Sequence, residues 1–183
     1  MAPSSTSDQA YSELLGQCTI RARVAFVLCI AEAETGVIDA GRAAAQVRSA
    51  LDLAWQWELT QDVSGDALYA ALENENEDGL MNYEWTAPDA QKPAWVAITS
   101  AIAYTSWHAF GGAGAKHTPE PINEVTEEVI DQVVANARRA PGFSQQFLDG
   151  LVRHCLENYR ARDPSSLGEP IRREVIWQAA NSA

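Results

Sequence analysis

Residues 93–110 read PAWVAITSAIAYTSWHAF, and this uncharged stretch decides the fold. Apolar side chains occur on every side of the helix that such a sequence forms, so the helix needs partners around its whole circumference. The stretch without Lys, Arg, Asp or Glu extends from Pro93 to Ala115. It lacks leucine, contains several Ser and Thr residues and ends in the glycine-rich residues 111–114, which favours a buried central helix over a membrane span. We therefore predict that other helices surround residues 93–110.

Helical periodicity continues on both sides of this stretch. No convincing run of alternating apolar and polar residues predicts a strand. Ser64 and Ser144 are placed to cap helices, and Pro170 suits the first turn of a last helix. Apolar residues at helical spacing recur over residues 20–31, 44–55, 129–137, 147–159 and 171–179.

These patterns define the domain organisation that we expect. The fold class is all-α, with six to seven packed helices in a single domain over residues 8–183. We expect residues 1–7 to form a disordered tail and residues 74–89 to form a loop before the central helix.

Acidic residues are concentrated in the first half of the chain. The sequence has 25 acidic and 13 basic residues, a formal net charge of -12. Residues 49–91 contain ten acids and no Lys or Arg. Such a charge repels nucleic acid and anionic membranes and favours a basic partner, although it also serves solubility. We therefore expect no nucleic-acid or membrane partner.

Part of this acidic stretch interleaves carboxylates with aromatic side chains. Carboxylates can steer a basic partner while aromatic rings anchor it, which is what a protein-binding face requires. The alternative is a solvated acidic face whose aromatics turn into the core. Trp55 and Tyr69 match helical stripes and favour the core, whereas both readings stay open for Tyr83 and Trp85. The candidate partner-binding residues are Glu73, Glu75, Glu77, Asp78, Tyr83, Glu84 and Trp85.

No complete catalytic or metal-binding pattern occurs in the sequence. Asn74-x-Asn76-x-Asp78-Gly79 resembles half of a calcium loop, but Trp85 stands where the loop needs a bidentate Glu. Helical magnesium-dependent pyrophosphatases use an ExxE followed by an ExxD, and the acidic pairs at 75–78 and 124–127 occur in the reverse order. We therefore predict a protein that is not an enzyme and needs no metal or cofactor.

Residues 95–128 carry a resemblance to a known family. Trp95 begins an apolar helix that ends Tyr104-Thr105-Ser106-Trp107-His108-Ala109-Phe110, and a linker leads to Pro119-Glu120-Pro121-Ile122 and Val125-Thr126-Glu127-Glu128. This pattern resembles the all-helical immunity proteins of bacterial polymorphic-toxin systems, specifically the sixth catalogued immunity family, over roughly residues 80–135. The resemblance implies a protein that binds and neutralises a cognate toxin made by the same bacterium. It brings no catalytic residue to this chain.

The acidic stretch and the resemblance favour one function, neutralisation of a toxin through an acidic, aromatic-containing surface. Many such toxins are nucleases or nucleotide-directed enzymes with basic clefts, which an acidic face can plug. Binding beside the active site is the alternative. A metal-dependent helical hydrolase and an unrelated intracellular adaptor or regulatory domain remain the competing functions. Three widely spaced cysteines, Cys18, Cys29 and Cys155, and an N-terminus without a secretory pattern predict a cytoplasmic protein.

Overall fold

Helices make up the fold wherever the structure describes it. The computed structural model describes residues 10–74, 76 and 78–182. The candidates Glu75 and Glu77, and the tail predicted at residues 1–7, lie outside the described residues. Within the described ranges there is no strand, only an isolated bridge between Cys18 and Arg160. The helices are α1 (Tyr11–Leu15), α2 (Ile20–Glu34), the 3-10 helix η1 (Thr35–Val37), α3 (Arg42–Thr60), α4 (Gly65–Leu72), α5 (Leu80–Thr86), α6 (Lys92–Gly112), α7 (Glu120–Asn123), α8 (Val129–Ala137), α9 (Gln145–Asn158) and α10 (Arg173–Asn181).

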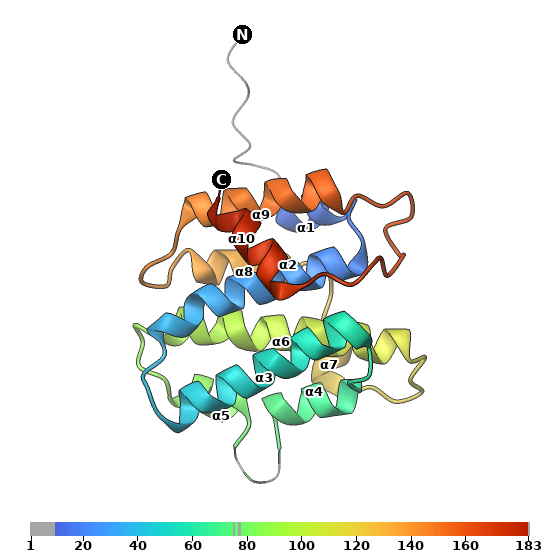
Figure 1. The fold of residues 1–183 in the computed structure, drawn as a ribbon. Coiled ribbons are helices and arrows are strands. Elements are labelled where there is room, and N and C mark those ends of the chain that lie inside the picture. Colours follow the sequence, from blue (N-terminus) through green and yellow to red (C-terminus); the bar gives the residue numbers. More distant parts are fainter. Residues whose placement is uncertain (1–9, 75, 77, 183) are drawn as a thin grey trace.

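Helix α6 runs through the middle of the fold, as its uncharged sequence predicts (Figure 1). It packs most extensively against α2, α8 and α4, so neighbours cover several of its sides. Ala97, Ala101 and Ile102 are wholly buried, and the small alanine side chains let neighbouring backbones approach closely. Gly65 starts α4 directly against α6, because a Cβ there would lie 2.5 Å from the ring of Phe110. No helix in the described part of the chain is both long enough and apolar enough to span a bilayer.

Helix α2 forms the second buried layer. Residues 24–31 are all buried, so this helix too is enclosed on every side. Figure 1 shows α1, α9 and α10 above α2, while α3, α4 and α5 lie at the bottom of the molecule beyond α6. The uncharged residues 24–31 of α2 and 93–110 of α6 therefore form the centre around which the amphipathic helices pack.

A C-terminal segment, residues 159–172, lies along the start of α2. The backbone N–H groups of Thr19, Ile20 and Arg21 donate to carbonyl oxygens of this segment at 3.0–3.1 Å. The first N–H groups of a helix have no partner within the helix, so the segment satisfies donors that would otherwise be left without acceptors. The buried Glu58 of α3 accepts the N–H of Ile171 at 3.0 and 3.1 Å, and burial raises the pKa of Glu58 to about 8.

The predicted number of six to seven helices is wrong. The described residues form ten α-helices, because α1, α5 and α7, with only four to seven residues each, were not predicted. One or two turns give too few apolar positions for a periodic stripe to stand out in the sequence. Residues 80–86, predicted as part of a loop, form α5 instead, which is held against α6. The predicted caps at Ser64 and Ser144 are confirmed, whereas α10 starts at Arg173, after Pro170.

Candidate partner-binding face

Helix α5, which follows α4 in the chain, carries three of the candidate residues, Tyr83, Glu84 and Trp85. Leu80, the first residue of α5, is buried and anchors the helix in the core. Gly79 makes the approach to α4 possible, because a Cβ at this position would lie 2.3 Å from the carbonyl oxygen of Leu72. This close contact between two backbone segments fixes where α5 begins, and so decides which of its side chains face inward.

The two candidate aromatics of α5 point in different directions. Residues two apart on a helix do not share a face. Tyr83 stacks on Trp95 of α6 with ring centroids 5.8 Å apart and an interplanar angle of 12°. Trp85 is 86% exposed, which makes it the most exposed large hydrophobic side chain among the described residues. Met81, one helical turn away from Trp85, is 47% exposed. The structure therefore places Trp85 and Met81 at the surface and packs Tyr83 against α6.

Each candidate carboxylate within the described residues has a hydrogen-bonding or ionic partner. The hydroxyl of Tyr69 donates to Glu73 at 2.5 Å, and this bond, followed by burial, raises the pKa of Tyr69 to about 12. The hydroxyl of Thr99 donates to Glu84. Arg42 lies outside the acidic stretch in sequence, yet its guanidinium forms an ion pair of 2.5 Å with Asp78. Glu73 and Glu84 therefore have neutral hydroxyl partners, whereas Asp78 is paired with the positively charged Arg42.

A hollow separates these two carboxylates. Its volume is about 260 Å³, and α4, α5, α6 and α7 contribute to its walls. Glu73 and Glu84 line it together with apolar side chains that include Leu72, Met81 and Ile122. A neighbouring hollow of about 240 Å³ is lined by Glu84, Trp85, Lys92 and Val96. We call this surface, defined by Glu73, Met81, Glu84, Trp85 and Val96, the α5 face. It combines apolar recesses, an exposed indole and carboxylates.

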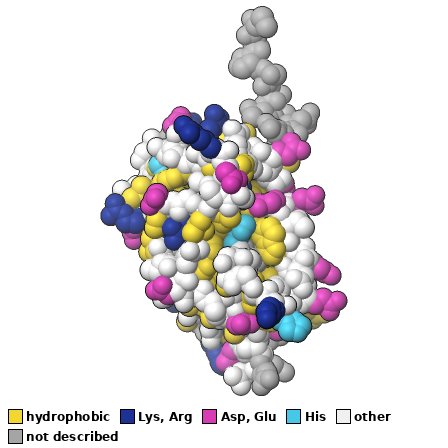
Figure 2. Space-filling view, turned by 90° about the vertical axis from the view of Figure 1, so that its right-hand side faces the viewer, with side chains coloured by type: hydrophobic (Ala, Val, Ile, Leu, Met, Phe, Trp, Pro, Cys, Tyr) yellow, Lys and Arg dark blue, Asp and Glu magenta, His cyan; other side chains and the backbone are white. Residues whose placement is uncertain are grey.

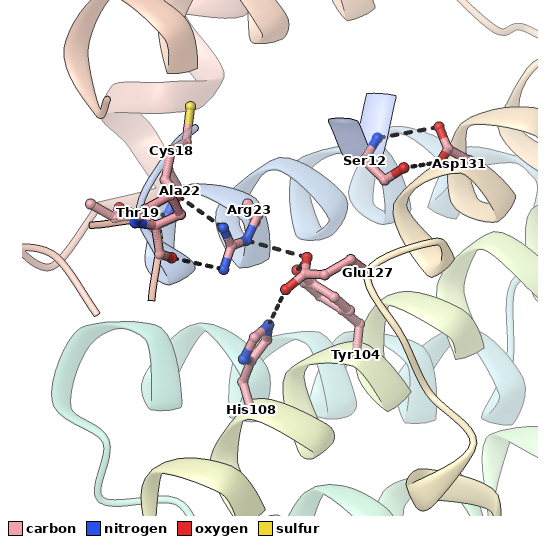
Figure 3. A network of polar contacts seen from close by, with 10 residues as sticks. Ser12, Cys18, Thr19, Ala22, Arg23, Tyr104, His108, Glu127 and Asp131 are labelled. Carbon is pink, nitrogen blue, oxygen red and sulfur yellow. Dashed lines mark hydrogen bonds and ion pairs between the residues drawn. The ribbon is translucent and has the colours of Figure 1, made fainter. Parts of the chain in front are cut away.

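A polar cluster that the sequence analysis did not identify lies at the junction of α2, α6 and the turn before α8 (Figure 3). The Nε atom of the buried Arg23 lies 3.3 Å from Oε2 of Glu127. The hydroxyl of Tyr104 donates to the same carboxylate at 2.5 Å. Nε2 of His108 lies 3.9 Å from Oε1 of Glu127. Glu127 thus links side chains from two core helices, and no local sequence signal could reveal this because Arg23 is far from the others in the chain.

His108 is neutral in this cluster. Burial, followed by the charge of Arg23, lowers the pKa of His108 to about 3. Its ring packs edge-on against Tyr104 at 4.7 Å and tilted against Trp107 at 4.6 Å. Figure 2 views the side of the molecule at the right of Figure 1 and shows hydrophobic side chains gathered in the middle of this face. An aromatic environment of this kind favours a packing role for the imidazole over acid–base chemistry.

We expect acid to destabilise the fold through His108. The pKa of an unfolded His is about 6.5, so between that value and about 3 the unfolded chain binds a proton that the folded chain excludes. Stability is therefore lost as the pH falls below 6.5. Relative to a His108→Phe variant, the wild type should lose about 2 kcal/mol of unfolding free energy between pH 7.5 and pH 5, as measured by urea denaturation. Parallel pH profiles for the two proteins would contradict this.

No group of three or more His, Cys, Asp or Glu side chains suited to a metal ion occurs in the described parts of the chain.

Comparison with known proteins gave one family. Residues 22–140 match the model of the family described as "Immunity protein Imm6". Neither the curated proteins nor the solved structures gave a match. The matched region extends from the first turn of α2 to the end of α8, so both the α5 face and the Arg23 cluster lie within it.

Proposed function

The chain belongs to the immunity protein Imm6 family, and from this premise we propose that it binds a cognate bacterial toxin and neutralises it through the α5 face. Membership of an immunity family implies a binding role rather than a catalytic one. The observation that carries the choice of surface is the exposed indole of Trp85 beside an apolar hollow. Exposed tryptophans are enriched among the residues that dominate binding energy in interfaces.

Charge complementarity supports a basic surface on the toxin. Four of the five residues that define the α5 face lie within residues 49–91, which have ten acids and no Lys or Arg. The fifth, Val96, follows Lys92, which lines one of the two hollows. Glu73 and Glu84 are held at the hollow by hydroxyl donors, which leave their charges uncompensated. A toxin with a cationic cleft, as in nucleases and nucleotide-directed enzymes, presents the matching charge. Glu75 and Glu77 stay candidate partner-binding residues on their sequence alone, and Asp78 contributes less because Arg42 neutralises it.

The proposed function is tested by identifying the toxin and then measuring protection. The tagged wild-type chain captures its partner from the producing bacterium, and mass spectrometry identifies that partner. The candidate toxin is then expressed in a sensitive host with or without the chain. We expect the host to grow only when the chain is co-expressed. A captured partner that is harmless by itself, or that kills equally in both hosts, would overturn the proposal.

The acidic residues should mainly set the rate of association. Exposed charges steer the encounter between proteins, and salt screens them over about 8 Å at physiological ionic strength. Replacing Glu75 and Glu77 with lysine should slow association with the toxin by about tenfold or more at low salt, as measured by surface plasmon resonance. The difference from wild type should shrink as salt is added.

A matched variant separates local from overall charge. Glu157 and Glu169 are exposed acids on α9 and before α10, and reversing both changes the net charge by the same amount. We expect this control to associate at nearly the wild-type rate. If the two double reversals slow association equally, overall charge steers the partner and the acidic segment around α5 has no special part in it.

A further inference from the structure

Glu34, at the end of α2, is a buried carboxyl group without a partner. The residue is 2% exposed, and its Oε2 atom has no hydrogen-bond donor. The other fully buried acid in the described residues, Glu58, accepts the N–H of Ile171 with both oxygens. Burying an ionised carboxylate without a partner is costly, and native structures rarely keep such a group unless a ligand or a function requires it.

Glu34 is one of the residues that line a small cavity with aromatic walls. The cavity has a volume of about 210 Å³ and is lined by residues near the end of α2, the start of α9 and the end of α10. These three helix ends lie in the left half of Figure 1. Phe147 of α9 and Trp177 of α10 form one wall, with ring centroids 5.0 Å apart and an interplanar angle of 58°. The lining residues are Ile30, Ala33, Glu34, Gly142, Phe143, Ser144, Phe147, Leu148, Trp177 and Asn181.

This lining selects for an organic cation. Glu34 is the one ionisable side chain among the described residues that line the cavity. The faces of Phe and Trp rings attract alkylammonium groups, and a carboxylate between them supplies the opposite charge. Glu34 also lies in the last turn of α2, where the helix dipole is negative and favours a cation over a carboxylate. A metal ion does not fit, because hard cations need several oxygen ligands and the walls here are mostly carbon.

We propose that the Glu34 cavity is a binding site for an alkylammonium group, held by the Glu34 carboxylate and the aromatic rings of Phe143, Phe147 and Trp177. The volume of about 210 Å³ is below the roughly 300 Å³ at which pockets for drug-sized ligands begin, so it suits a single amine or one lysine side chain. The site lies on different helices from the α5 face, and it stands whether or not that face binds a toxin.

The binding test uses defined amines rather than an unknown ligand. Burial raises the pKa of Glu34 to about 7, so titrations are made at pH 8.5, where the carboxyl group is mostly ionised and an alkylammonium is still charged. n-Butylammonium and tetramethylammonium chloride are added to the wild-type protein, and NMR follows the Glu34 carboxyl and Trp177 indole signals. We expect saturable binding of at least one amine, with both signals moving together. Sodium chloride controls for ionic strength.

Variants and neutral analogues decide the outcome. Glu34→Gln keeps the shape and removes the charge, so the affinity for the amine should fall at least tenfold, while circular dichroism shows an unchanged helical spectrum. Glu157→Gln, an exposed acid of α9, should bind the amine as the wild type does. Equal binding of n-butanol and n-butylammonium, undiminished binding to Glu34→Gln, or no saturable binding of either amine would overturn the proposal.

A further arm identifies the source of the amine. A blocked Gly-Lys-Gly peptide presents the same ammonium group on a protein-like side chain. Binding of the peptide with an affinity similar to that of n-butylammonium indicates a lysine from a partner protein. Binding of the free amines without the peptide indicates a small-molecule ligand.

Discussion

Replacing Arg23 with methionine is expected to lower the free energy of unfolding by about 3 kcal/mol, because each hydrogen bond from a charged donor contributes about 1.5–3 kcal/mol. The guanidinium is buried and donates to the carbonyl oxygens of Cys18 at 3.0 Å and of Pro164 at 3.1 Å. It also pairs with Glu127 at 3.3 Å (Figure 3). Methionine replaces the aliphatic stem of Arg23 but removes the guanidinium donor from the carbonyl oxygens of Cys18 and Pro164, whereas Glu127 keeps the hydrogen bond from Tyr104.

Two comparisons make this result specific to Arg23. Arg153→Met removes an exposed arginine from α9 and should change the free energy of unfolding by less than about 0.5 kcal/mol. Arg23→Lys should fall between the wild type and Arg23→Met, because an ammonium cannot reach three acceptors in the geometry of a planar guanidinium. Urea denaturation of all four proteins at pH 7 provides the measurement. A loss below about 1 kcal/mol for Arg23→Met would mean that the cluster is not needed to hold α2, α6 and α8 together.

Replacing Trp85 with alanine is expected to raise the dissociation rate of the toxin complex about 30-fold. An anchoring aromatic at the centre of an interface contributes at least about 2 kcal/mol when truncated, and 1.4 kcal/mol corresponds to a tenfold change. Because the side chain is 86% exposed in the free chain, its removal should leave the melting temperature nearly unchanged. Surface plasmon resonance separates this effect on dissociation from the effect of the acidic residues on association.

Val175→Ala provides the matched control for Trp85→Ala. Val175 is an exposed apolar residue on α10, a helix that does not contribute to the α5 face. Its truncation should leave both rate constants unchanged. If Trp85→Ala dissociates as slowly as the Val175→Ala control, the indole is not an anchor, and the interface has to be sought on another face.

The long helices could be predicted from the sequence because each has many residues over which a pattern can repeat. The start of α2 at Ile20 and the span of α6 follow directly from their apolar content. Helix α5 could not be predicted, because its seven residues lie between polar segments and its place depends on contact with α6. The position of Gly79 against Leu72 is likewise a property of the folded chain and has no local signal.

In the candidate site too, the sequence predicts local composition but not contacts between helices. The acidic, aromatic composition of residues 73–85 was visible in the sequence, whereas the sequence left open whether Trp85 is exposed. Its role in binding stays a prediction. The sequence could not show that Tyr83 packs on Trp95 or that Arg42 pairs with Asp78, because both partners come from other helices. The sequence could not identify the Glu34 site for a related reason. Only the packed structure shows that an oxygen of this carboxyl group accepts no hydrogen bond.

Titrating the purified toxin with the purified chain measures neutralisation itself, through the toxin's own activity. We predict that the activity falls to near zero at one equivalent of wild-type chain and of Val175→Ala, whereas Trp85→Ala requires an excess. Full toxin activity in the presence of a large excess of wild-type chain would contradict an immunity function for this protein.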